Sequence, residues 1–177
     1  MSLADAVHGF DERVDAALER VRGRSKILDR VFLTASEFGD FSVIWQIVNV
    51  VRGLVTGHYA EMFLFAGLLG AESLVVNQGI KRLFRRVRPT ETGDLRYQVR
   101  RPRTSSFPSG HASSAFYAAS ILTAWSGWVT LPAWFALAVV VGLSRAYVRI
   151  HHASDVVGGA IVGAVLAQLA LAVLRFV

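Results

Sequence analysis

The sequence predicts an all-α fold, an integral-membrane bundle of about five transmembrane helices with an amphipathic helix at the N-terminus. Three observations lead to this prediction: 53% of the 177 residues are hydrophobic, the mean hydropathy is +0.43, and long apolar stretches recur along the chain. A helix needs about 20 apolar residues to cross a bilayer. The chain therefore has room for these spans in a single domain, residues 1–177.

The N-terminal segment, residues 1–26, is predicted to form the amphipathic helix. Residues 2–5 resemble a capping box, and apolar side chains then recur at helical spacing opposite charged ones: Val7, Phe10, Val14, Leu18 and Val21. Such a helix either lies in the membrane interface or packs against the bundle, and the pattern leaves both open. The cations that follow suit an anionic lipid surface: Arg22, Arg24, Lys26 and Arg30.

The spans themselves are expected in five apolar stretches, near residues 41–56, 59–79, 111–129, 130–148 and 156–177. The second stretch contains Glu72, an ionisable group inside a predicted span. A carboxylate at that depth indicates either a functional role or a structural pair with an arginine of a neighbouring helix.

Residues 81–110 form the long polar segment between the second and third spans. This segment contains nine of the 19 lysines and arginines and three of the four prolines. A structureless segment of this length in a compact chain is usually functional. We therefore expect an active-site loop here.

Composition excludes several classes of site and partner. The chain has no cysteine, which excludes disulfides and thiolate metal sites. The net charge of +6 is not accompanied by a soluble basic face or a groove-reading motif, so membrane lipids are the expected partner and nucleic acid is not. The oligomeric state is left open.

Three polar patches contain most of the side chains that could do chemistry: residues 81–89, 108–111 and 144–155. Each lies at the end of a predicted span, and because successive spans alternate in direction, all three ends share one side of the membrane. Lys81, Arg88 and Arg145 supply three cations, and the fork of an arginine matches two phosphate oxygens.

The second patch adds a helix start. Ser109 and Gly110 precede His111 where a helix is expected to begin, and free backbone N–H groups there favour an anion. The implied ligand of the three patches is a phosphoryl group.

Two histidines and one carboxylate could then divide the work of a phosphatase without a metal ion. If the chain is helical there, His151 and Asp155 lie on one face, so the carboxylate holds one ring nitrogen and leaves the other for phosphorus. His111 could protonate the leaving oxygen and later activate water. The alternative is a metal-dependent hydrolase with these three residues and His152 as ligands, which the surrounding cations disfavour. Otherwise His152 is expected to be structural.

The pattern K-x6-RP, PSGH, SR-x5-H-x3-D, across residues 81–155, resembles the three-part signature of the type 2 phosphatidic acid phosphatase (PAP2) family. The resemblance implies a helical membrane bundle and a metal-independent lipid phosphatase that needs no cofactor. It also implies His151 as the nucleophile that forms a phosphohistidine, Asp155 as its orienting partner and His111 as the general acid. The implied phosphate binders are Lys81, Arg88, Ser109, Gly110 and Arg145.

Two other interpretations of this signature are less well supported. Vanadium haloperoxidases are similar in these motifs, but a small membrane-embedded chain fits the lipid phosphatase branch better. A non-catalytic scaffold would be expected to have broken motif positions, and every position is filled.

Further arginines of the loop either contact a second anionic group of the substrate or anchor the loop to lipid headgroups, and anchoring is favoured. Four of them lie near the middle of the loop and are the candidates for secondary anion contacts: Arg96, Arg100, Arg101 and Arg103. Three lie closer to its start: Arg82, Arg85 and Arg86.

The charge distribution predicts the side of the membrane. With five spans, 17 lysines and arginines fall on the side of the three patches, whereas Arg52 and Arg175 fall on the other. The positive-inside rule then places the active site on the cytoplasmic face of the cell membrane.

The expected substrate is a lipid intermediate still under construction. Small size and an Arg-, Ala- and Val-rich composition resemble the actinobacterial branch of the family that acts on decaprenylphosphoryl-5-phosphoribose, a precursor for cell-wall arabinan. Undecaprenyl pyrophosphate, phosphatidylglycerophosphate and phosphatidic acid are the alternative substrates.

Overall fold

The computed structural model describes residues 2–89, 97 and 104–176. Within these residues every regular element is a helix, which confirms the all-α prediction. The main helices are α1 (Leu3–Glu19), α2 (Lys26–Phe38), α3 (Val43–Thr56), α4 (Tyr59–Leu74), α5 (Gly110–Ser126), α6 (Leu131–Tyr147) and α7 (Ala153–Leu174). A π-helical turn at Val75–Gly79 and a 3₁₀ turn at Ile80–Leu83 continue α4, and shorter 3₁₀ turns occur at Asp40–Ser42 and Trp128–Thr130.

Three helical stretches are long and apolar enough to cross a membrane: Tyr59–Leu83, Trp128–Tyr147 and Ala153–Leu174. A fourth span results if α2 and residues 40–56, which meet at a bend of 74°, are counted together. The other two predicted spans form shorter helices, α3 with 14 residues and α5 with 17. By length and composition the described residues thus supply three or four spans rather than five.

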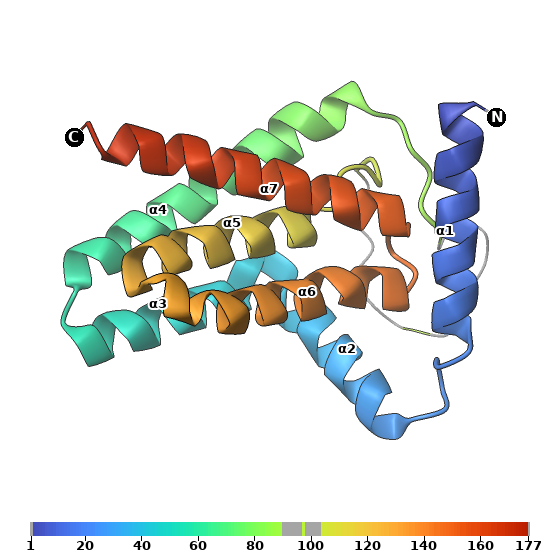
Figure 1. Cartoon of the computed structure of the whole chain (residues 1–177), viewed down its shortest axis with the longest axis horizontal. Coiled ribbons are helices and arrows are strands. Elements are labelled where there is room, and N and C mark those ends of the chain that lie inside the picture. Colours follow the sequence, from blue (N-terminus) through green and yellow to red (C-terminus); the bar gives the residue numbers. More distant parts are fainter. Residues whose placement is uncertain (1, 90–96, 98–103, 177) are drawn as a thin grey trace.

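Helix α5 is the most deeply buried of the helices and lies between α6 and α7 (Figure 1). Two glycines of α7 allow this close packing. A Cβ atom added at Gly159 would lie 2.3 Å from the carbonyl oxygen of Ser109, and one at Gly163 would lie 2.0 Å from that of Ser113. Small residues four positions apart let the backbones of two membrane helices approach in this way.

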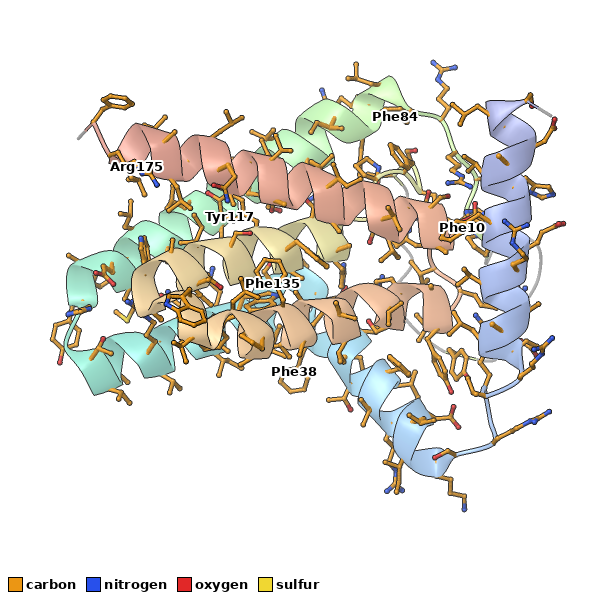
Figure 2. The ribbon with its side chains drawn as sticks, viewed as in Figure 1. Phe10, Phe38, Phe84, Tyr117, Phe135 and Arg175 are labelled. Carbon is orange, nitrogen blue, oxygen red and sulfur yellow. The ribbon has the colours of Figure 1, made fainter. Side chains whose placement is uncertain are left out.

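The apolar core lies along α3, α4, α5 and α6. Its largest fully buried members include Trp45, Phe65, Leu69, Ile121 and Leu122. Phe135 lies between α5 and α6 (Figure 2), with its ring centroid 5.7 Å from that of Phe116. Large apolar side chains of α7 point outward instead, as expected for a lipid-facing surface: Val157, Ile161, Val165, Leu169 and Val173.

Helix α1 crosses one end of the bundle, at the end of α6 and the start of α7 (Figure 1). The predicted capping box is confirmed, because Ser2 and Asp5 exchange hydrogen bonds of 3.1 and 2.8 Å. The helix packs against α6 and α7, and it ends at Glu19 rather than near residue 26; its placement in a membrane interface stays a prediction.

The turn after α1 contains one buried cation. Arg22 donates to the carbonyl oxygens of Ala146 and Tyr147 at 2.8 Å each, at the C-terminus of α6. It also pairs with Asp15 and Glu19 of α1. The prediction that Arg22 faces lipid is therefore wrong, because it neutralises the carbonyl end of a helix; Arg24, Lys26 and Arg30 are exposed.

Candidate active site

A cavity of about 340 Å³ opens beside the start of α5, where α4 and the bend between α2 and α3 form its other walls. Five of the eight residues that the sequence assigned to the site line it: Lys81, Gly110, His111, Arg145 and His151. The other three are buried next to this group. Arg88 and Asp155 both contact His151, and the backbone N–H of Ser109 donates to the carbonyl oxygen of Asp155 at 3.0 Å. The fold thus brings all eight together.

His151 lies in the turn between α6 and α7, outside either helix, because α7 begins only at Ala153. The two residues were expected on one helical face if the chain is helical there, and it is not helical at His151, but Asp155 in the first turn of α7 still reaches back to the imidazole. Its Oδ2 atom is 3.5 Å from Nδ1 of His151. Ser106 bridges the two, 3.4 Å from that nitrogen and donating to the carboxylate at 2.5 Å.

The other ring nitrogen of His151 faces a cation. Nη1 of Arg88 lies 3.1 Å from Nε2 of His151, and because a guanidinium can only donate, Nε2 acts as the acceptor. The proton of the neutral ring therefore sits on Nδ1, toward Asp155. This tautomer leaves the lone pair on Nε2, the nitrogen required of a nucleophile.

Burial lowers the pKa of His151 well below its usual range, and the positive charges of Arg88 and Arg145 lower it further. The hydrogen bond and charge of Asp155 act in the opposite direction without reversing the shift. At neutral pH the imidazole of His151 is therefore uncharged and competent to attack an electrophile.

Arg88 is held in place by backbone carbonyl groups of two separate segments. It donates to Ile150 at 3.1 Å, and to Thr104 and Ser105 at 3.2 and 3.1 Å. The guanidinium thereby joins the loop before α5 to the turn that contains His151. A cation fixed in this way needs little reorganisation when an anion binds beside it.

Within the described residues, Arg145 is bound through only one of its three side-chain nitrogen atoms. Its Nη1 atom donates to the hydroxyl and the carbonyl oxygen of Ser36 on α2. Its Nε and Nη2 atoms are buried, and no hydrogen-bond partner for them exists among the residues that the structure describes. Unpaired buried donors are costly, and in a residue that lines the cavity they suit an anion bound there.

Lys81 and the start of α5 complete the positive lining. A Cβ atom added at Gly110 would lie 3.3 Å from Nζ of Lys81 and 3.0 Å from Oδ1 of Asn77, so a larger residue would press on both side chains. The hydroxyl of Ser109 caps α5 by accepting from the N–H of Ala112 at 3.4 Å. The first N–H groups of the helix then remain available to an anion.

His111 is held by the bend between α2 and α3. Its Nε2 atom lies 3.0 Å from Oδ1 of Asp40 and 3.3 Å from the carbonyl oxygen of Ser36. Gly39 must be glycine here, since an added Cβ would lie 2.5 Å from the ring. Sequence reasoning missed Asp40 as a partner; the only signal was an acidic residue next to a glycine at the start of an apolar stretch.

Two further residues that sequence reasoning missed contact Asp155. Ser106 carried no signal beyond its place two residues before the PSGH motif. Arg86 was expected to anchor the loop to lipid, and this is wrong, because its guanidinium donates to Asp155 at 2.6 Å and to Asp11 of α1 at 2.6 Å. The four arginines proposed for secondary anion contacts, Arg96, Arg100, Arg101 and Arg103, lie outside the described residues.

The remaining expectations concern Glu72, His152 and metal ligands. Glu72 is buried and accepts a hydrogen bond from Ser113 of α5, so the partner found across the helices is a hydroxyl rather than an arginine. The backbone N–H of His152 donates to Asp155 at 2.9 Å. In the part of the chain that the structure describes, no three His, Asp or Glu side chains are arranged to hold a metal ion.

Comparison with known proteins identifies the family. The family model described as the PAP2 superfamily matches residues 53–176. The chain belongs to the PAP2 superfamily. It is 32% identical to the decaprenylphosphoryl-5-phosphoribose phosphatase of Mycolicibacterium smegmatis over 160 residues. The matched region covers 89% of this chain and 84% of the relative. It is 30% identical over 151 residues to the protein of that name from Mycobacterium tuberculosis, covering 82% of this chain and 83% of the relative.

A solved structure supports the fold. The transmembrane PAP2 type phosphatidylglycerolphosphate phosphatase from Bacillus subtilis superposes with a TM-score of 0.74 at 24% identity, over 97% of this chain and 88% of that one. With its family, its relatives and its long apolar helices, the PAP2 protein described here is a membrane-embedded lipid phosphatase.

Proposed function

We propose that this PAP2 phosphatase removes the terminal phosphate of decaprenylphosphoryl-5-phosphoribose, without a metal ion, through a phosphohistidine at His151. The mechanism is supported above all by the setting of His151. Its Nδ1 atom faces Asp155, its Nε2 atom accepts from Arg88, and it lines a cavity that also contains Arg145. The substrate is suggested by two relatives, 32% and 30% identical, that are known as decaprenylphosphoryl-5-phosphoribose phosphatases.

The cationic lining would bind the phosphate. Arg145 has two buried donors without a partner among the described residues. Lys81 and the N-terminus of α5 line the same cavity, and Arg88 contacts His151, which also lines it. Charge on the equatorial oxygens of a phosphoryl group is stabilised in the transition state by donors that are already in position. Ser109 contributes by capping α5, and Gly110 by leaving room for Lys81.

In the first step the N–H of Arg88 turns from Nε2 of His151 to an oxygen of the phosphate, and the freed lone pair of Nε2 attacks phosphorus. The N–P bond forms as the P–O bond to the ribose breaks, and the leaving oxygen takes a proton from His111. His111 must enter this step protonated, which burial and Arg145 oppose, and which Asp40, 3.0 Å from its Nε2 atom, and the bound anionic phosphate favour. Asp155 accepts a hydrogen bond from Nδ1–H of His151 and offsets the positive charge that develops on the imidazole ring.

In the second step water attacks the phosphohistidine while His111 recovers its proton from that water. The N–P bond breaks, inorganic phosphate leaves, and His151 returns to its neutral form. Lipid phosphate and water are thereby converted to a lipid alcohol and phosphate.

The active site is proposed to face the cytoplasm. If the five apolar stretches all cross the membrane, of which three or four are long and apolar enough by the structure, 17 lysines and arginines would fall on its side and Arg52 and Arg175 on the other. Arg175 lies at the far end of α7 from α1 (Figure 2). An intermediate completed on that face has a phosphodiester besides the phosphate to be removed, and the loop arginines 96, 100, 101 and 103 would be available to bind it.

The test is phosphate release by purified protein in excess chelator. The substrates are decaprenylphosphoryl-5-phosphoribose, phosphatidylglycerophosphate, phosphatidic acid and undecaprenyl pyrophosphate. We expect the first to be hydrolysed fastest, His151→Ala to abolish release, and the neighbouring His152→Gln to retain most of it. Activity lost in chelator, or retained in His151→Ala, would overturn the mechanism; a different best substrate would overturn the assignment of decaprenylphosphoryl-5-phosphoribose.

A further inference from the structure

The carboxylate of Asp155 is held from behind by a chain of charged side chains that ends on α1. Its Oδ2 atom faces His151 and Ser106, and its Oδ1 atom accepts from Nη1 of Arg86 at 2.6 Å. The other terminal nitrogen of Arg86 donates to Oδ2 of Asp11 at 2.6 Å. One guanidinium therefore joins the carboxylate beside His151 to a carboxylate 144 positions away in the sequence.

We propose that Arg86 and Asp11 are positioning residues for the pair His151–Asp155, so that α1 is a working part of the active site. This inference rests on the proposed role of His151. Arg86 fixes the plane of the Asp155 carboxylate, and Asp11 fixes Arg86. Neither residue needs to touch the substrate for this role.

The Asp11 end of the chain is itself firmly bound. Asp11 is 5% exposed and accepts from the backbone N–H and the hydroxyl of Ser154 at 2.8 Å each. Arg86 also donates to that hydroxyl at 2.7 Å. Buried carboxylates are retained only where several donors satisfy them. Asp11 thus ties α1 to the first turn of α7, next to Asp155.

A second cavity shows how close α1 lies to the nucleophile. It measures about 190 Å³, and its lining includes Asp11, Leu18 and Ala146 together with His151. Displacing α1 would therefore change the surroundings of His151 directly. Mechanically, a misplacement of about 1 Å of a reacting group can cost about 100-fold in rate.

The decisive variant is Arg86→Met, which keeps an unbranched side chain and removes the fork. We expect kcat to fall about 10- to 100-fold, since a misplacement of the reacting imidazole by up to about 1 Å can cost about 100-fold, while KM changes by less than about threefold because the phosphate contacts remain. Arg86→Lys, with a point charge in place of the fork, should recover only part of kcat.

A titration of His151 distinguishes a positioning role of Arg86 from a purely structural one. Without Arg86 the negative charge of Asp155 is less neutralised, so the pKa of His151, followed by NMR of the labelled ring, should rise. Arg82→Met removes an exposed cation that donates to Gln78 and should leave this titration where it is. Among the described residues, the charged or titratable groups around His151 include, besides Arg86 behind Asp155, Arg88, Arg145, Asp155, Lys81, His111, Asp40, His152, Arg149, His8, Asp11, Glu12 and Asp15.

The matched control for α1 is Asp15→Asn. Asp15 also ties α1 to the bundle, through Arg22 and Arg149 at 2.8 Å each, but it has no contact with Arg86 or Asp155 among the described residues. Asp11→Asn should lower kcat about three- to tenfold, and Asp15→Asn by less than about twofold. Equal losses in both would mean that Asp11 merely docks the helix, and would overturn the inference.

A double variant tests whether Asp11 acts through Arg86. If it does, the kcat of the double variant, Asp11→Asn with Arg86→Met, should lie within about twofold of the kcat of Arg86→Met alone. A kcat reduced by the product of the two single losses would contradict a role of Asp11 through Arg86. Size-exclusion elution and the melting temperature in detergent identify variants that fail to fold. An inactive His151→Ala with a fully active Arg86→Met refutes only this inference, whereas an active His151→Ala refutes the proposed function.

Discussion

The two ends of the bundle differ in how they treat charge. At the end crossed by α1, Arg22, Arg88 and Arg145 are all buried, and each is held by oxygen atoms of other segments. At the opposite end, where α3 meets α4, Arg52 pairs with Glu61 at 2.6 Å beside an apolar core that includes Phe65. Arg88 and Arg145 of the first end lie at the proposed phosphate site, whereas the ion pair of the second joins two neighbouring helices.

The difference has a thermodynamic basis. A buried cation loses several kcal/mol of hydration, and its protein partners offset that loss incompletely. Such a group is tolerated where the remaining helices bury enough apolar surface. The far half of the bundle supplies it, with Trp45, Leu69 and Ile121 fully or almost fully buried. The apolar packing of the far half thus offsets the cost of burying the cations beside the proposed active site.

Arg145→Met should give the largest effect, because it removes a buried cation from the charged end of the bundle. We expect kcat/KM to fall about 10²- to 10³-fold, because a donor to the transferring phosphoryl group is lost. The melting temperature in detergent should stay the same or rise, since a buried charge with unsatisfied donors is replaced by an apolar side chain. A variant with kcat/KM within about threefold of the parent would contradict the phosphate-binding role.

Gly163→Ala tests the packing that joins the two ends. The added Cβ would lie 2.0 Å from a backbone oxygen of α5, so α5 and α7 must separate, at a cost of about 1–3 kcal/mol in the free energy of unfolding. Gly67→Ala on α4 is the control, because no atom lies within 4 Å of its added Cβ. Thermal unfolding should show a clear loss for the first and none for the second; equal effects would refute the close contact.

The titration of His151 sharpens the comparison through pH. Because its pKa lies below the usual value of 6.5, the ring should remain neutral as the pH falls through 6.5. Between the two pKa values the folded state binds fewer protons than the unfolded state, so this histidine's contribution to stability, full above 6.5, is lost as the pH falls. NMR titration, assigned with His151→Gln, should show a midpoint below 6.5; a midpoint at or above it would contradict burial of the ring.

Arg52→Met should give the smallest effect. The pair with Glu61 is partly exposed, and such pairs contribute about 0–1 kcal/mol. We expect a small shift in melting temperature and an unchanged kcat, measured beside Arg145→Met under the same conditions. A loss of kcat comparable to that of Arg145→Met would show that the two ends are coupled and would remove the distinction between them.

Local features of the chain were sufficient to predict α1 and α3 to α7, but not α2, and to select candidate site residues that the fold brings together. Hydropathy is a property of each segment by itself, so it predicts a helix without knowledge of the rest of the fold. The apolar stretches predicted in this way are helical in the structure. The motif residues have fixed spacings within three short segments, and antiparallel helices bring the ends of those segments together. For these reasons Lys81, Arg88, His111, Arg145 and His151 could be assigned to one site before their positions were known.

Only the tertiary structure decided which charges pair. Asp11 meets Arg86 and Ser154, Asp40 meets His111, and Arg22 meets the end of α6, all across separations that no sequence period relates. An ion pair between distant segments depends on how whole helices pack, and that packing depends on contacts such as those of Gly159 and Gly163. The sequence therefore determined the chemistry available to this protein, while the packing of its helices determined which groups hold that chemistry in place.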